Sequence, residues 1–325
     1  MISFEEITKI YDDGRMAVSG LSFEIQKGEF FVLIGPSGCG KTTVLKMINR
    51  LIEASGGRIM IEGRPVDDYK LNELRWNIGY VLQQIALFPH MSIAENVAVV
   101  PELMKIPRAE SDKRVEHLLS MVGLDPDVYR DKRPAELSGG QQQRVGVVRA
   151  LAADPDILLM DEPFSALDPV TREKLQNDLL ELQRNIRKTI VFVTHDMREA
   201  LKLGDRICIM KDGEVVQIGT PNDIVHRPAD DFVREFLGDA AGREGFGASA
   251  LTAEDLADPL APDSRLVADG AVTVRADTAL GELLWHFAVE ERLLVRRGDE
   301  VIGLLDRDKT LRRMAREFQE GGAAE

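Results

Sequence analysis

Four short apolar runs, each ending abruptly in a polar or glycine-rich segment, constrain the fold of this 325-residue chain more than any other feature. The runs are Phe30–Ile34, Ile78–Leu82, Ile157–Met160 and Ile190–Val193. Continuous apolar runs of this length suit strands that are buried on both faces, as in a parallel sheet with helices around it. The pattern therefore predicts an α/β fold, against the alternative of four unrelated core strands.

Candidate site residues follow each of these runs. Gly35 comes directly after the first run, Gln83 after the second, Asp161 and Glu162 after the third, and His195 lies just beyond the fourth. In parallel sheets, ligands bind beyond the carboxyl ends of the strands. We therefore expect these side chains and the glycine loop to gather along one edge of the sheet.

The segment after the first run matches the phosphate-loop pattern G-x-x-x-x-G-K-[ST]. Its residues are Gly35-Pro36-Ser37-Gly38-Cys39-Gly40-Lys41-Thr42, and Thr43 follows them. Glycines let the backbone curl so that successive N–H groups point at phosphate oxygens, and the helix beginning near Lys41 adds its positive end. Lys41 can reach the β- and γ-phosphates of ATP, and the Thr42 hydroxyl can bind Mg²⁺. We predict that all of these residues bind the nucleotide; the alternative is a glycine turn without a ligand.

The chain has two cysteines, Cys39 and Cys208, which fit a reducing compartment better than a disulfide scaffold. Cys39 lies in the phosphate loop near a lysine and a helix start, a setting that can lower the pKa of a thiol. A redox role is one interpretation. We favour the other, a small residue that the loop tolerates.

Asp161 and Glu162 supply the chemistry that a phosphate loop needs. An acidic residue at a strand end can hold Mg²⁺, and an adjacent carboxylate can polarise the attacking water. A purely structural acidic pair is the alternative.

Composition restricts the function classes. With 44% hydrophobic and 30% charged residues the chain suits a globular protein of one large and one small domain. The net charge of −14 disfavours a general nucleic-acid binder, so we expect no nucleic-acid partner. No apolar run approaches the roughly 20 residues that span a bilayer, and no signal peptide is visible at the first residues.

One further segment resembles the signature motif of ABC ATPases: Leu137-Ser138-Gly139-Gly140-Gln141-Gln142-Gln143-Arg144. Ser138 can cap a helix whose free N–H groups, with Gly139 and Gly140 allowing close approach, form a second anion site. A plain capped helix is the alternative. In ABC ATPases the signature of one subunit closes on the nucleotide held by the other. The resemblance implies a head-to-tail dimer with a second copy, in which Ser138, Gly139, Gly140 and Gln141 contact ATP.

Other positions are similar to further ABC ATPase motifs. The resemblance implies that Tyr11 stacks on adenine and that Gln83 senses Mg²⁺ and water, with Gln84 as an adjacent competitor. It places Mg²⁺ between Thr42, Gln83 and Asp161.

The catalytic positions follow from the same resemblance. Glu162 matches the catalytic base and His195 the switch histidine that contacts the γ-phosphate, which together with Gln83 and Lys41 completes the catalytic set. Asp168 ends the D-loop, Ser165-Ala166-Leu167-Asp168, and joins the nucleotide-binding residues.

The resemblance covers about residues 1–240, with a helical subdomain at about 90–150. Residues 241–269 are rich in Gly, Ala, Asp and Pro, and we interpret them as a linker. Residues 270–325 predict a small α/β segment with a tail: strands at 271–276, 292–296 and 301–305, and helices at 280–291 and 310–318.

Two stretches, Trp76–Met91 and Val99–Leu103, resemble the importer subfamily for compatible solutes such as glycine betaine, carnitine, choline and proline betaine. This resemblance implies separate transmembrane permease subunits and, indirectly, a substrate-binding protein. It also implies a peripheral location at the cytoplasmic face of a prokaryotic inner membrane. An importer of another small solute, such as a polyamine, sugar or amino acid, is the alternative, and a non-transport ABC ATPase is a remote one.

Residues 271–311 resemble a single cystathionine-β-synthase (CBS) motif, a module that these importers often carry in tandem; an unrelated α/β cap is the alternative. Asp306 and Lys309 stand where nucleotide-binding versions usually have Ser or Thr and then Asp. We therefore expect a dimer contact or an ionic-strength sensor rather than nucleotide sensing.

Overall fold

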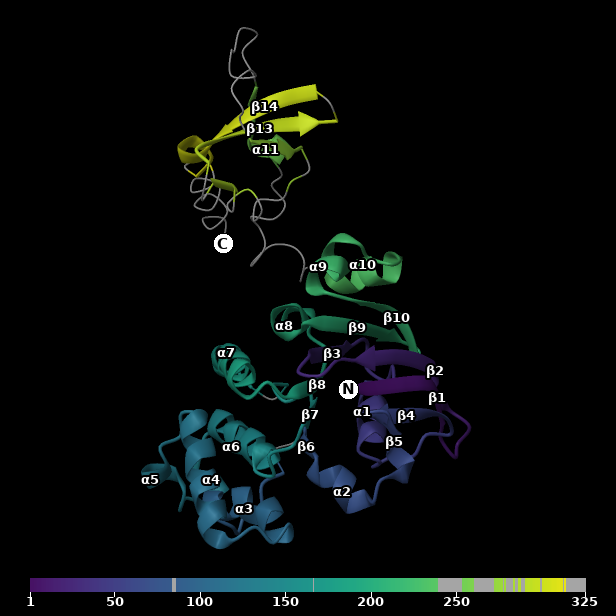
Figure 1. Cartoon of the computed structure of the whole chain (residues 1–325), viewed down its shortest axis with the longest axis vertical. Helices are drawn as coiled ribbons and strands as arrows, with labels where there is room; N and C mark the ends of the chain where they lie inside the picture. Colours follow the sequence, from purple (N-terminus) through teal and green to yellow (C-terminus); the bar gives the residue numbers. More distant parts are fainter. Residues whose placement is uncertain are drawn as a thin grey trace. The chain divides into compact units, whose positions relative to one another are not determined.

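The computed structural model describes residues 1–83, 86–165, 167–238, 253–259, 272–276, 278, 283, 286–287, 290–298, 300–311 and 313. The chain forms two compact units, Met1–Leu237 and Gly238–Glu325 (Figure 1). Each unit has its own cluster of buried apolar side chains.

A six-stranded sheet in the order β10-β9-β3-β8-β7-β6 organises the first unit. Its strands are β3 (Phe30–Ile34), β6 (Ile78–Val81), β7 (Ile157–Asp161), β8 (Thr189–Thr194), β9 (Arg206–Lys211) and β10 (Glu214–Gly219). Neighbouring strands run parallel except for β9 and β10, and β3, β7 and β8 are buried along their whole length. The predicted parallel sheet is confirmed, and all four apolar runs belong to it.

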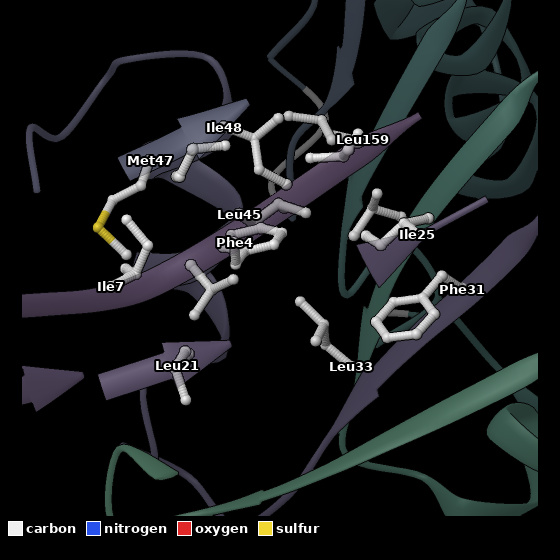
Figure 2. Packing of buried hydrophobic residues seen from close by; sticks show 14 of the residues in the cluster. Phe4, Ile7, Leu21, Ile25, Phe31, Leu33, Leu45, Met47, Ile48 and Leu159 are labelled. Carbon is white, nitrogen blue, oxygen red and sulfur yellow. The ribbon is translucent and has the colours of Figure 1, made fainter. Parts of the chain in front are cut away.

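A second, antiparallel sheet packs over the first helix. Its order is β2-β1-β4-β5, with β1 (Ile2–Ile10), β2 (Met16–Ile25), β4 (Gly56–Ile61) and β5 (Arg64–Pro65). Figure 2 shows Leu45 and Ile48 of α1 (Lys41–Ile48) in one cluster with Phe4 of β1 and Phe31 and Leu33 of β3. Burial of each such side chain stabilises the fold by roughly 1.5–3 kcal/mol. This packing anchors α1, and with it the loop that precedes the helix.

Four helices follow one another between β6 and β7 and lie together in Figure 1. They are α3 (Ile93–Leu103), α4 (Arg108–Met121), α5 (Pro126–Tyr129) and α6 (Gly139–Leu151). A capping box of Ser92 and Glu95 begins α3. Arg144 of α6 donates to the carbonyl oxygen of Val122 (2.6 Å), directly after α4. It also pairs with Asp178 of α7 (Pro169–Ile186), so Arg144 connects the end of α4 to α7.

The remaining helices of this unit are α2 (Leu71–Trp76), α7 (Pro169–Ile186), α8 (Met197–Leu203), α9 (Pro221–His226), α10 (Asp231–Leu237) and the 3₁₀ helices η1 (Val66–Asp68) and η2 (Pro134–Glu136). Within the ranges given above, no helix combines the length and apolar character needed to cross a bilayer.

The second unit contains a small sheet in the order β11-β14-β13-β12. Its strands are β11 (Asp258–Pro259), β12 (Thr273–Arg275), β13 (Arg292–Arg297) and β14 (Glu300–Asp306). β12 runs parallel to β13, and β13 runs antiparallel to β14. The three predicted strands are confirmed. Of the two predicted helices, residues 283, 286–287, 310–311 and 313 are helical, whereas the described residues 290 and 291 are not, so the predicted end of the first helix at residue 291 is wrong.

The predicted linker is wrong for residues 253–259. These residues form α11 (Ala253–Leu256) and β11, which pairs with β14. Ala253 and Leu256 are buried in the core of the second unit with Val274 and Leu305. Two buried apolar side chains and the half-buried Ala257 anchor this segment, too few to produce a periodic pattern in the sequence. The rest of the predicted linker, residues 241–252 and 260–269, lies outside the described residues.

Candidate functional site

The loop between β3 and α1 is packed so closely that two of its glycines have no room for a side chain. A Cβ atom on Gly40 would lie 2.5 Å from the carbonyl oxygen of Ala17, and the φ of Gly40 is 102°. A Cβ atom on Gly35 would collide with the carbonyl oxygen of Met210. A Cβ atom on Gly38 would meet nothing within 4 Å, so this side of the loop is open. The loop is thus tied to β2 and β9 on one side and free to receive a ligand on the other.

Lys41, the first residue of α1, supplies a buried positive charge beneath this loop. The Lys41 side chain is buried, and its Nζ donates to the carbonyl oxygens of Gly35 (2.7 Å) and Pro36 (2.9 Å). A buried charge needs polar partners, which the loop backbone provides. Pro36 and Ser37 are exposed, so an anion can approach the loop from solvent. An ammonium group and backbone N–H donors at a helix start form a site suited to phosphate.

Cys39 is buried in the same loop, with 4% of its surface exposed. Burial raises the pKa of the Cys39 thiol, and the nearby Lys41 charge opposes that rise only in part. A buried thiol with a raised pKa is a poor nucleophile. The environment therefore favours the interpretation of a small tolerated residue over a redox role.

Thr42 and Asp161 bring a hydroxyl group and a carboxylate together at the end of β7. Thr42 Oγ1 donates to Asp161 Oδ1 (2.8 Å), and the Tyr80 hydroxyl donates to Asp161 Oδ2 (3.4 Å). Burial raises the pKa of Asp161, while the Thr42 hydrogen bond and the charge of Lys46 oppose the rise. The pKa of Tyr80 is raised by burial and by the Asp161 charge. Oxygen ligands of this kind suit a hard cation such as Mg²⁺.

Glu162 occupies a sharp turn directly after β7. Its φ is 44°, a conformation that L residues with a side chain rarely adopt. The turn is held by hydrogen bonds: the Glu162 N–H donates to Val193 O (3.0 Å), and the Glu162 carbonyl accepts from the Ser165 N–H (3.3 Å) and hydroxyl (3.0 Å). The turn directs the carboxylate to His195, whose Nδ1 lies 2.9 Å from Glu162 Oε2. A strained position of this kind is common at functional sites.

Gln83 is the one strand-end residue that the structure does not join to the others. It is exposed after β6, and among the described residues no hydrogen bond links it to Asp161 or Glu162. Gln84, the competing candidate, lies outside the described residues.

Tyr11 lies close to the first turn of α1 although it is far away in the sequence. Its hydroxyl oxygen is 3.2 Å from Thr43 Oγ1, within hydrogen-bond distance. The Lys9 ammonium and the Arg15 guanidinium lie 5.4 and 5.3 Å from the centre of its ring. The ring is half-buried, so an aromatic surface borders the phosphate loop.

The signature segment begins α6 with a capping box. The Gln141 N–H donates to Ser138 Oγ (3.3 Å), and the Ser138 N–H donates to Gln141 Oε1 (2.9 Å). Gly139 and Gly140 form the first turn, and a Cβ atom on Gly140 would lie 2.5 Å from Thr171 Cγ2. The signature segment therefore packs against α7 of the same chain. Among the described residues, no hydrogen bond joins it to the phosphate loop.

Asp168 caps α7. Its Oδ1 accepts from the Thr171 N–H (3.0 Å), and these hydrogen bonds lower the pKa of Asp168. Ala166 of the predicted D-loop lies outside the described residues.

Two sets of residues around the site were not predicted. Tyr80, inside an apolar run, contacts Asp161. Glu199 and Arg172 surround the turn that carries His195. A glutamate four residues after a candidate catalytic histidine was the available signal for Glu199, and the sequence offers none for Arg172.

Comparison with known proteins identifies the family. The ABC transporter family model matches residues 18–165. The glycine betaine uptake system ATP-binding protein YehX of Escherichia coli is 45% identical over 306 residues, which are 94% of this chain and 94% of that protein. The chain belongs to the ATP-binding proteins of ABC transporters. The predicted ABC ATPase fold is thereby confirmed.

Other ABC proteins are similar over a smaller share of the chain. The choline transport ATP-binding protein OpuBA of Bacillus subtilis is 57% identical over 238 residues, which are 73% of this chain and 62% of that protein. This chain therefore spans less than two thirds of the length of the first curated ABC relatives it matches. The ATP-binding cassette MJ0796, in a dimeric post-hydrolysis structure bound to ADP and Pi, is 37% identical with a TM-score of 0.61. The match covers 68% of this chain and 99% of the MJ0796 chain.

Proposed function

We propose that this protein hydrolyses MgATP and thereby powers an ABC importer of a quaternary-amine compatible solute. The observation that carries the proposal is the pairing of Glu162 with His195 at 2.9 Å, next to the hydroxyl–carboxylate pair of Thr42 and Asp161. These four residues lie at the ends of β7 and β8 and at the start of α1, where the phosphate loop also ends.

ATP is the proposed substrate of the loop. The open side at Gly38 and the N–H groups before α1 receive the phosphates, with Ser37, Cys39, Gly40 and Thr43 contributing backbone or hydroxyl donors. Lys41 exchanges its carbonyl partners for phosphate oxygens, which are stronger acceptors for an ammonium group. Tyr11 supplies the face on which adenine stacks.

Magnesium fits the oxygen atoms that the chain offers. Thr42 and Asp161 would hold the ion, with Gln83 as a further ligand. Among the described residues no group of three or more His, Cys, Asp or Glu forms a metal cluster. When bound, the ion neutralises charge on the phosphates.

Glu162 acts as the base in this proposal. A carboxylate can only accept hydrogen bonds, so Nδ1 of His195 carries the proton that it donates to Glu162. His195 thus orients the carboxylate, which accepts a proton from the attacking water. When both ring nitrogens carry a proton, Nε2 of the exposed imidazole can donate to the γ-phosphate while Nδ1 donates to Glu162.

A second copy of the chain completes the proposed site. Ser138, Gly139, Gly140, Gln141 and Asp168 of one copy close on the ATP held by the other, in a head-to-tail dimer. The dimeric structures of MJ0796, a relative with 37–38% identity, support the formation of a dimer.

The solute is proposed from the relatives. Proteins named for transport of choline and uptake of glycine betaine are 57% and 45% identical to this chain. Separate transmembrane permease subunits would bind the ATPase at the cytoplasmic face of a prokaryotic inner membrane. A substrate-binding protein would select the solute by cation–π contacts. The second unit, as a CBS-like motif, serves a dimer contact or ionic-strength sensing.

Uptake of labelled glycine betaine tests this proposal. A strain lacking the gene is complemented with the wild type or with Glu162→Gln, at low and high osmolarity. We expect uptake only with the wild type, rising with osmolarity. Uptake that survives Glu162→Gln would contradict the proposed motor. A lack of uptake despite verified permease subunits would direct the search to another solute and leave the ATPase proposal standing.

A further inference from the structure

Arg172, in the first turn of α7, contacts three separate segments of the chain. Its NH2 group donates to the carbonyl oxygen of Leu167 (3.1 Å), just before α7. Its NH1 group lies 3.8 Å from Asp196 Oδ2, and its Nε lies 3.9 Å from Glu199 Oε1. One guanidinium group therefore joins the D-loop, the residue after His195, and helix α8.

Glu199 and Asp196 are themselves bonded to the residue before His195. The Thr194 hydroxyl donates to Glu199 Oε2 (2.6 Å) and accepts from the Asp196 N–H (3.0 Å). Gln176 of α7 donates to Glu199 Oε1 (3.3 Å), and Glu199 is buried. Both neighbours of His195 in the chain thus belong to the network around Arg172.

The start of α7 also touches the signature segment. Gly140 packs so closely on Thr171 that a Cβ atom would lie 2.5 Å from Thr171 Cγ2, and a Cβ atom on Gly139 would lie 4.0 Å from Leu167 Cδ2. Movement of the signature segment toward or away from α7 therefore acts on the residues that flank Arg172. Packed interiors transmit such displacements because they contain few voids.

We propose that Arg172 is a positioning residue that couples the signature segment and D-loop to the His195 turn of the same chain. The inference rests on the proposed function, in which the signature segment closes on the nucleotide of a second copy. Contact with that nucleotide then adjusts His195 at the chain's own nucleotide. Arg172 thereby links the two ATP sites of the dimer.

The contacts of Arg172 leave room for this adjustment. Its two ion pairs, at 3.8 and 3.9 Å, are longer than the 2.7–3.2 Å of a good N–H···O hydrogen bond. Its Nε is buried without a hydrogen-bond partner. A small shift of α7 toward α8 would satisfy this donor, and hydrogen bonds of an active site often tighten only when its ligands are bound. Lysine carries its three donors on one nitrogen, so it cannot match the three directions in which the nitrogens of the planar guanidinium reach these acceptors.

Steady-state ATPase kinetics test the coupling in the full-length protein. We expect Arg172→Gln to lower kcat at least tenfold, with the Kd for ATP and the Tm close to wild-type values. Arg172→Lys should recover only part of the loss. Arg184→Gln, an exposed arginine of the same helix, is the matched control and should keep wild-type kcat. A double-mutant cycle with Glu199→Gln should be non-additive, because the two residues act through one contact.

An NMR measurement without nucleotide separates this inference from the proposed function. The chain has five histidines, and His195→Ala assigns the His195 imidazole signals. We expect Arg172→Gln, but not Arg184→Gln, to shift these signals by more than their line width.

The outcomes distinguish the two proposals. Unchanged His195 signals in Arg172→Gln would overturn the coupling. So would a kcat of Arg172→Gln equal to that of an active wild type. A decrease in kcat that is explained by weaker ATP binding or by a lower Tm would overturn it as well. Full recovery by Arg172→Lys would overturn the requirement for three contacts. A wild type that hydrolyses no ATP would contradict the proposed function instead, and the His195 signals would still test the coupling.

Discussion

His195 and Glu162 follow two neighbouring strands of the parallel sheet, and their Nδ1 and Oε2 atoms lie 2.9 Å apart. The geometry is imposed by the backbone, because Glu162 has a φ of 44° and donates its N–H to the residue at position 193 on the neighbouring strand. The Glu162 side chain is 20% exposed and that of His195 is 57% exposed. The carboxylate is therefore shielded, while the imidazole can reach a ligand.

Glu162→Gln should remove the base and preserve the shape of the site. Because general base catalysis typically contributes 10²- to 10⁴-fold, we expect kcat to fall at least about a hundredfold. ATP binding should remain close to wild type, measured with a fluorescent nucleotide. Glu181→Gln, at an exposed glutamate of α7, is a control for loss of a carboxylate outside the site. A kcat within threefold of wild type in Glu162→Gln would rule out its role as the base.

Thr42→Val should weaken the dependence on Mg²⁺. It replaces the hydroxyl that donates to Asp161 (2.8 Å) with a methyl group of similar size. We expect ATPase activity to require a much higher Mg²⁺ concentration, and chelation with EDTA to abolish activity in the wild type. A Mg²⁺ titration of the ATPase rate measures both effects. An unchanged Mg²⁺ dependence would exclude Thr42 as a ligand.

Ser138→Ala should separate helix capping from nucleotide binding. Loss of an N-cap costs about 1 kcal/mol, and Ser92→Ala removes the same type of capping box from α3. We expect similar decreases in unfolding free energy for both variants, but a strong decrease in ATPase activity only for Ser138→Ala. Equal ATPase activities would show that Ser138 is only a cap.

Glu199→Gln should stabilise the protein at neutral pH. Burial raises the pKa of Glu199, opposed by the Thr194 hydrogen bond and the Arg172 charge, so the ionised carboxylate is less favourable in the folded state than in the unfolded chain. This cost is present in full above the folded-state pKa and disappears below the unfolded value of about 4.3.

Urea denaturation at several pH values measures this effect. The stability gained by Glu199→Gln should shrink as the pH falls from 8 toward 4. Glu173→Gln, an exposed glutamate of α7, should show no such trend. A gain that grows on acidification would contradict the assigned direction of the pKa.

Cys39 should react slowly with thiol reagents. Because burial raises the pKa of this thiol, little thiolate is present at neutral pH. We expect alkylation by iodoacetamide, followed by mass spectrometry, to be at least about tenfold slower in the native protein than in urea. Cys39→Ala should retain ATPase activity, whereas rapid native alkylation would restore the redox interpretation.

The features that could be predicted from the sequence are those that neighbouring residues specify. A run such as Ile157–Met160 cannot be solvated on either face, so it must be a buried strand. The pattern from Gly35 to Thr42 specifies a loop followed by a helix, because glycines at these positions permit the turn and Ser, Thr and Lys side chains suit phosphate and metal. The order of the motifs was sufficient to recognise the ABC family.

Long-range packing alone decided the rest. Nothing local marks residues 253–259 as part of the second unit, because Ala253 and Leu256 are buried only when the sheet of that unit forms. Likewise the sequence around Arg172 predicts only a surface residue of a helix. Arg172 contacts Leu167, Asp196 and Glu199 because α7 packs against α8 in the folded chain. Periodicity reports which face of an element is buried, but the partner of each buried or charged group is set by which elements meet in the folded chain.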